Sequence, residues 1–183
     1  MPESMNTAEK PQTRKSASEH LLMLVLLAVL TAMEIVLSRF LSINTWNLKI
    51  GFSFVPIVIA AILLGPVYAG IVGALADFVG AILFPIGAYF PGFTLTAFLM
   101  GAVFGLFLYK KQSLPRILGA VAVNQFVLSL LVNTLWISVL YGSPYGPLLV
   151  TRLVQTGILT VVQVVVIGLI VKALPRLRKG FAA

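Results

Sequence analysis

Six apolar runs separated by short turn signals dominate this chain and leave it few possible folds. The runs cover residues 20–40, 52–65, 67–84, 93–110, 115–140 and 150–174. About 20 apolar residues cross the hydrocarbon core of a bilayer, so six crossings use nearly the whole chain of 183 residues. Only 10% of the residues are charged, against about 25% in a soluble domain. The pattern predicts an all-α integral membrane protein with six transmembrane helices.

The polar ends of the chain set the expected domain organisation. We expect a disordered cytosolic tail over residues 1–18, a six-helix membrane domain over 19–176, and a basic cytosolic tail over 177–183. The second apolar run is short for a full crossing and carries Pro56 in its first turn. No stretch remains that could form a soluble domain.

The cations are divided unequally between the two sides of the predicted bundle. Six crossings put both termini on one side, and ten of the thirteen lysines and arginines lie there: Lys10, Arg14, Lys15, Lys110, Lys111, Arg116, Lys172, Arg176, Arg178 and Lys179. Positively charged residues are enriched on the cytoplasmic side of membrane proteins. Both termini are therefore predicted to be cytoplasmic, in an orientation that the span count and the charge bias support independently.

Three cations, Arg39, Lys49 and Arg152, fall at the outer ends of spans or in outer connections. Two interpretations remain open. Long basic side chains extend from helix ends toward water. Alternatively, an anionic ligand arrives from outside, and the planar guanidinium of arginine can bond both oxygens of a carboxylate.

An aromatic segment, Tyr89-Phe90-Pro91-Gly92-Phe93, lies between the third and fourth runs on the same outer side. Proline fixes φ and glycine permits positive φ, so Pro91-Gly92 is predicted to form a tight turn. The aromatics could form an interfacial belt, or they could stack on a flat ring. Together with the outer cations, they favour an anionic ligand with a flat heteroaromatic ring.

Acidic and amide residues inside the apolar runs are further candidates for polar chemistry. Intramembrane acids usually face the protein interior or a cavity, so Glu34 and Asp77 are interpreted as members of internal ion pairs, ligand contacts or proton relays.

The amides of the last two runs divide by depth. Asn133 with Trp136, and Gln155 with Arg152, are predicted to point into one outer cavity. The deeper amides are interpreted as interhelical hydrogen-bonding groups: Asn124, Gln125 and Gln163.

Several chemistries find no support in the sequence. The chain has no cysteine, and therefore no disulfide, cysteine-ligated metal site or thiol nucleophile. It lacks the G-x-x-x-x-G-K-[ST], H-E-x-x-H and G-x-S-x-G motifs. We expect no enzyme, no metal and no cofactor in this chain, but a substrate-binding membrane module that takes its energy from elsewhere.

Residues 20–174 resemble the substrate-binding S component of an energy-coupling factor (ECF) vitamin transporter. The first span carries the small-xxx-small pair Ala28 and Ala32 that is common in this class. The folate-specific members are similar in the more specific segment Gly87-Ala-Tyr-Phe-Pro-Gly-Phe-Thr-Leu-Thr-Ala-Phe98. They are also similar in three shorter segments: Phe54-Val-Pro56, Gly65-Pro-Val-Tyr-Ala-Gly70 and Ala74-Leu-Ala-Asp77.

The resemblance implies a multi-pass protein of a prokaryotic plasma membrane that captures folate outside and delivers it inward. The partners it implies are a transmembrane T protein, which would meet Ala28 and Ala32, and two ATPases that would use ATP and Mg. Folate joins a flat pterin to p-aminobenzoyl-glutamate and so offers both a stacking face and carboxylates. The residues expected to bind it are Arg39, Lys49, Tyr89, Phe90, Pro91, Gly92, Phe93, Thr94, Asn133, Trp136, Arg152 and Gln155.

Two other functions fit the same residues. An S component for another vitamin, such as riboflavin, would use the aromatic outer face and would need fewer outer cations. A proton-coupled secondary transporter would use Glu34 or Asp77 and need no ATPase.

Overall fold

The computed structural model of the chain describes residues 11–44 and 49–180, with side chains for 20–43 and 50–173. The helices are α1 (Pro11–Arg39), α2 (Phe54–Leu63), α3 (Pro66–Leu83), α4 (Pro91–Leu108), α5 (Leu114–Ala122), the π-helix η1 (Val123–Val132), α6 (Asn133–Tyr141) and α7 (Tyr145–Gly180). The segments α5, η1 and α6 follow one another directly, so they form one crossing from Leu114 to Tyr141.

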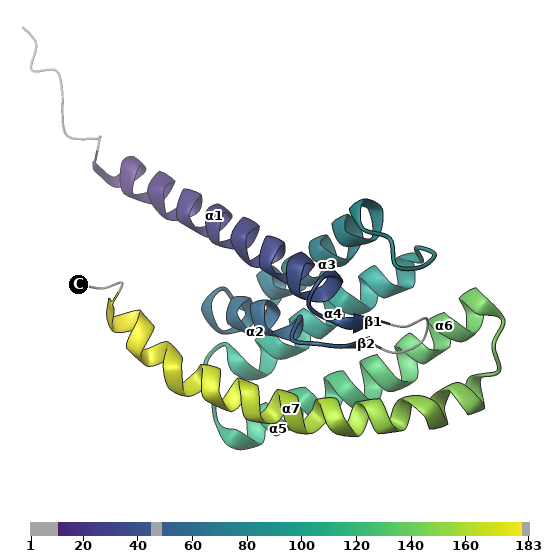
Figure 1. The fold of residues 1–183 in the computed structure, drawn as a ribbon. Coiled ribbons are helices and arrows are strands. Elements are labelled where there is room, and N and C mark those ends of the chain that lie inside the picture. Colours follow the sequence, from purple (N-terminus) through teal and green to yellow (C-terminus); the bar gives the residue numbers. More distant parts are fainter. Residues whose placement is uncertain (1–10, 45–48, 181–183) are drawn as a thin grey trace, which may run out of the picture.

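The predicted helical bundle is confirmed. Within the described residues, five helical segments are long and apolar enough to cross a membrane. The remaining apolar run forms α2, which has only 10 residues, as its short length predicted. Figure 1 shows the start of α1 and the end of α7 on the same side of the bundle, as a six-segment chain requires.

The ends of the chain differ from the expected tails. Helix α1 begins at Pro11 and α7 continues to Gly180. Residues 11–18 therefore belong to α1, and residues 177–180 belong to α7. The first ten residues and the last three lie outside the described part of the chain.

A short antiparallel hairpin connects α1 to α2. Strands β1 (Ile43–Asn44) and β2 (Lys49–Ile50) pair with Ile43 opposite Ile50, and β2 contacts α7. The β1–β2 hairpin lies at the end of the bundle where α1 ends (Figure 1).

Small residues allow α3 and α4 to pack closely against each other. A Cβ on Gly73 would lie 2.6 Å from the carbonyl oxygen of Ala97, and one on Gly101 would lie 2.2 Å from that of Ala69. Because real Cβ atoms do not approach so closely, neither position has room for a side chain. The small residues of α3 and α4 therefore serve internal packing.

The core of the bundle forms around the short helix α2. Val58, Ala60 and Ala61 are fully buried there, together with Phe104 of α4 and Ile167 of α7. Helix α2 is thus surrounded by longer helices, and a cavity can open at one end of it.

Candidate functional site

A cavity of about 490 Å³ lies within the bundle, and its lining includes residues close to the C-terminal ends of α1 and α3 and the N-terminal end of α4. It opens among the end of α1, the later half of α3, the start of α4, η1 with α6, and the first half of α7. Its volume is within the 300–1,000 Å³ range of small-molecule sites. The charge bias of the sequence predicts that this end of the bundle faces away from the cytoplasm.

Seven of the twelve predicted ligand-binding residues line this cavity, namely Arg39, Tyr89, Phe90, Phe93, Asn133, Arg152 and Gln155. They come from α1, the 84–90 connection, α4, α6 and α7. Residues that are distant in sequence therefore line one cavity. A binding site formed by the outer cations and aromatics requires this convergence.

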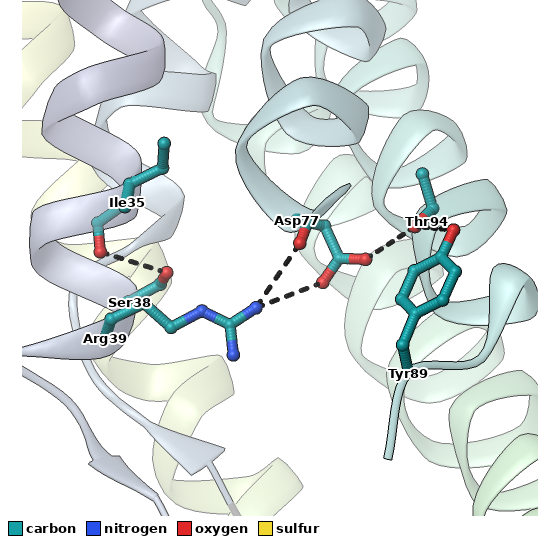
Figure 2. Close-up of polar contacts among 6 residues, drawn as sticks. All are labelled: Ile35, Ser38, Arg39, Asp77, Tyr89 and Thr94. Atoms are coloured by element: carbon teal, nitrogen blue, oxygen red, sulfur yellow. Dashed lines mark hydrogen bonds and ion pairs between the residues drawn. The ribbon is translucent and has the colours of Figure 1, made fainter. Parts of the chain in front are cut away.

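Arg39, on the last turn of α1, is held by Asp77 of α3. Its Nη2 lies 3.9 Å from Asp77 Oδ1 and donates a hydrogen bond to the Asp77 carbonyl oxygen at 3.4 Å (Figure 2). Glycine at position 80 makes room for this side chain, because a Cβ there would lie 2.8 Å from Arg39 Nε. Arg39 thus faces the cavity with a carboxylate already beside it.

The other oxygen of Asp77 extends this network to α4 and the 84–90 connection. Thr94 Oγ1 donates to Asp77 Oδ2 at 2.8 Å, and the Thr94 and Tyr89 hydroxyls lie 3.3 Å apart (Figure 2). Thr94 does not line the cavity, whereas Asp77 and Tyr89 do. Thr94 therefore anchors Asp77, a contact that the sequence did not indicate.

Arg152, on α7, has a different environment. It is only 6% exposed, and its Nη2 donates to the carbonyl oxygen of Ser129 at 3.2 Å. Its Nη1 is buried without a hydrogen-bond partner, and no carboxylate within the described part of the chain pairs with it. A buried guanidinium without a counter-ion is costly.

The aromatic wall is built in two layers. Phe90 packs edge-on against Phe93 with ring centroids 6.1 Å apart, and its other neighbour is Trp136, at 5.5 Å. Trp136 lies behind this wall and donates its Nε1–H to Thr96 Oγ1 at 3.0 Å. The prediction that Trp136 points into the cavity with Asn133 is therefore wrong for Trp136, which supports Phe90 instead.

The predicted Pro91-Gly92 turn is present as the first turn of α4, since the Phe93 N–H donates to the Phe90 carbonyl oxygen at 3.0 Å, but Gly92 does not adopt a positive φ. Pro91 is the first residue of α4, and Phe90 before it is extended. Proline suits this position because its fixed φ matches the helix and its missing N–H would have no intrahelical partner. Gly92 is required by close packing, since a Cβ there would lie 2.8 Å from the Trp136 ring. Neither residue lines the cavity.

Lys49 cannot be placed relative to the cavity. Its backbone pairs with Asn44 in the hairpin, but its side chain lies outside the described residues. Its predicted role stays a prediction.

Two glutamines of the site were predicted from the sequence to form interhelical hydrogen bonds. Gln125 and Gln163 line the cavity, whereas Asn124 makes the expected interhelical bond, from its Nδ2 to the Met100 carbonyl oxygen at 3.2 Å. Spacings of four and eight residues could have identified them, because polar residues recur at 125, 129 and 133 and at 155 and 163. The π-helix η1, a rare form often found at functional sites, carries the first of these series.

The small pair on α1 lies away from the cavity. Ala28 and Ala32 are both exposed and line no part of it. This position leaves them available for a neighbouring protein or lipid.

Comparison with known protein sequences gives three similarities. The family model for the ECF transporter substrate-specific component matches residues 22–177. A curated folate transporter FolT from Clostridium novyi is 43% identical over 145 residues, which are 79% of this chain and 84% of that protein. Another from Leuconostoc mesenteroides is 33% identical over 123 residues, 66% of each chain.

A solved structure is similar as well. It is a crystal structure of FolT bound with folic acid, with a TM-score of 0.75 and 40% sequence identity over 79% of this chain and 89% of that one.

Proposed function

The chain belongs to the family of substrate-specific components of ECF transporters, and from this premise we propose that it captures folate in the cavity described above. It is a multi-pass membrane protein that binds a transported substrate, and its family is not one of enzymes. The similarity to folate transporters, and to a FolT structure holding folic acid, supports folate as the cargo.

The observation that carries this proposal is the environment of Arg152. A buried guanidinium with an unpartnered Nη1 at a cavity wall is suited to a carboxylate that the ligand supplies. Folate carries two carboxylates on its glutamate, and Arg39 lies on the α1 side of the same cavity. The aromatic wall of Phe90 and Phe93 offers stacking faces to the planar part of the molecule.

Equilibrium binding of folate to the purified protein tests this function. The chain has two tryptophans, Trp46 and Trp136, so a Trp46→Phe variant leaves one reporter behind the aromatic wall. We expect nanomolar folate to change the Trp136 fluorescence without ATP or any partner, and riboflavin and thiamine to have no effect. Tight binding of riboflavin or thiamine with no response to folate would overturn folate as the cargo.

Delivery into the cell would depend on partners that supply energy. We propose that a transmembrane T protein docks on α1 at Ala28 and Ala32, and that two ATPases bind ATP and Mg²⁺. The exposure of both alanines on an apolar helix supports this contact, because small residues allow close helix approach. We propose the plasma membrane of a prokaryote as the location.

Bulky substitutions on α1 test the docking surface. We expect Ala28→Trp and Ala32→Trp to abolish ATP-dependent folate uptake in cells that hold the partner subunits, while the purified variants bind folate normally. Val161→Trp is the matched control, since Val161 is 65% exposed on α7 and lines no part of the cavity. Normal uptake by both α1 variants would contradict this docking surface.

A further inference from the structure

Three cations lie close together in sequence where α4 ends and α5 begins. Lys110 and Lys111 follow the end of α4 at Leu108, and Arg116 lies in the first turn of α5. All three are exposed, none lines the cavity, and together they form the basic patch. Figure 1 shows this connection on the side of the bundle where α1 begins and α7 ends, which the charge bias predicts to be cytoplasmic.

No carboxylate among the described side chains balances the basic patch. The acids in the ranges whose side chains are described, 20–43 and 50–173, are Glu34 and Asp77. Both of them line the cavity, and Asp77 pairs with Arg39. No ion pair of the described residues involves the basic patch. Its three positive charges therefore have no counter-charge among these residues.

The helix dipole accounts for the lysines of the patch but not for its arginine. A helix carries partial negative charge at its C-terminus and partial positive charge at its N-terminus. Lys110 and Lys111 follow the C-terminus of α4, where a cation is stabilised. Arg116 lies at the N-terminus of α5, where a cation is disfavoured and the first turn holds no acid. The position of Arg116 therefore calls for an anion that the described residues do not supply.

The apolar neighbours of the basic patch indicate that this anion belongs to a lipid. Leu114 and Leu118 on α5 are 62% and 47% exposed, whereas Ile117 and Val121 of the same helix are buried in the core. Helix α5 begins a membrane crossing that continues through η1 and α6. Exposed leucines at the end of a crossing lie against acyl chains, and the cations beside them lie at the level of the headgroups. An acidic protein surface would not require these leucines.

Contacts within the connection hold the basic patch in place. Gln112 Nε2 donates to the Leu108 carbonyl oxygen at 2.8 Å and so caps the end of α4. The Tyr109 ring packs against Gly65, where a Cβ would lie 3.4 Å from it. A connection that is already ordered loses less conformational entropy when it binds a ligand.

We propose that Lys110, Lys111 and Arg116 bind the headgroup phosphate of an anionic phospholipid in the adjacent leaflet. The guanidinium can bond two phosphate oxygens, and the two ammonium groups act as point charges. The neighbouring leucines would contact the acyl chains of the same lipid. The bound lipid would fix the depth of the α4–α5 connection in the membrane. This inference is independent of which cargo the cavity holds.

Native mass spectrometry of the purified full-length protein tests the inference. The micelles hold equal amounts of phosphatidylglycerol and phosphatidylcholine, which share the phosphate and differ in net charge. We expect the wild-type protein to retain phosphatidylglycerol over phosphatidylcholine by at least about tenfold, because each cation near an anionic headgroup strengthens binding about fivefold. Equal retention of the two lipids by the wild-type protein would overturn the inference without any substitution in the chain.

The triple variant Lys110→Gln, Lys111→Gln and Arg116→Gln assigns the preference to the basic patch. We expect it to lower the preference for phosphatidylglycerol by at least about fivefold. Exchanging each lysine for arginine and the arginine for lysine keeps the charges and should keep the preference. Gln112→Ala is the uncharged control in the same connection and should also keep it. Folate binding by each variant confirms that the variant is folded.

Thermal unfolding separates a lipid from a free anion. Phosphatidylglycerol should raise the melting temperature of the wild-type protein and not that of the triple variant, and added salt should weaken the effect. Inorganic phosphate should not reproduce it, and an equal rise with inorganic phosphate would overturn the lipid as the ligand. An unchanged lipid preference in the triple variant, with loss of folate uptake in cells, would assign the basic patch to an acidic protein instead.

Discussion

The two arginines at the cavity occupy contrasting environments. Arg39, at the end of α1, has the Asp77 carboxylate 3.9 Å away, and Thr94 anchors that carboxylate at 2.8 Å. Arg152, across the cavity on α7, touches only the Ser129 carbonyl oxygen among its described hydrogen-bond partners. Among the described residues, a carboxylate pairs with Arg39 and none pairs with Arg152.

The difference assigns the two residues different parts in ligand binding. A ligand carboxylate at Arg152 supplies a missing partner, so the whole free energy of that interaction contributes to ligand binding. At Arg39 the same carboxylate must share the guanidinium with Asp77, and the gain is smaller. The following substitutions test this asymmetry, from the largest expected effect to the smallest.

Arg152→Gln should have the largest effect. We expect folate affinity to fall by at least about 30-fold, or about 2 kcal/mol, because a desolvated charge pair is lost. The melting temperature of the ligand-free protein should be unchanged or higher, since a buried charge without a partner is removed. Fluorescence titration and thermal unfolding measure both quantities. Arg116→Gln, which removes an exposed cation on α5, is the control, and equal affinity in the two variants would refute the asymmetry.

Arg39→Gln should lower folate affinity less, by about tenfold, and should also destabilise the ligand-free protein. The destabilisation follows because Asp77 loses its ion-pair partner. The double variant with Asp77→Asn should recover the lost stability in a double-mutant cycle. If Arg39→Gln and Arg152→Gln weaken binding equally, with no loss of stability, the two arginines have the same role.

Asp77→Asn should raise folate affinity by about threefold. Asparagine keeps an oxygen that can accept the Thr94 hydrogen bond but removes the charge that competes for Arg39. Isothermal titration calorimetry of the purified variant measures this change. A tenfold loss of affinity would instead indicate that Asp77 itself contacts the ligand.

Gly80→Ala should have the smallest effect, a loss of about twofold in folate affinity. The new Cβ would lie 2.8 Å from Arg39 Nε, and the flexible arginine can move aside with a stability change of about 0.5 kcal/mol. Gly168→Ala is the matched control, because a Cβ there meets nothing within 4 Å. A large loss in Gly80→Ala would place Arg39 among the principal ligand contacts.

Features that depend on local composition could be predicted from the sequence. Hydropathy and charge placement, which are sums over the residues of a segment, indicate three such features. They are the order of the apolar runs, the short α2 and the side of the bundle that holds the cavity. The residues that line the cavity were predicted in part for the same reason. Arg39, Phe90 and Arg152 lie at span ends on the outer side, and span ends are visible in sequence.

Features that depend on packing could not be predicted in this way. The sequence indicates outer arginines, but only the packing of the helices decides that Asp77 pairs with Arg39 while no carboxylate of the described residues pairs with Arg152. Gln125 and Asn124 are adjacent amides in one apolar run, and η1 turns one to the cavity and the other to α4. Hydropathy is a property of single residues, whereas charge compensation and cavity lining are properties of pairs, which only the tertiary structure brings together.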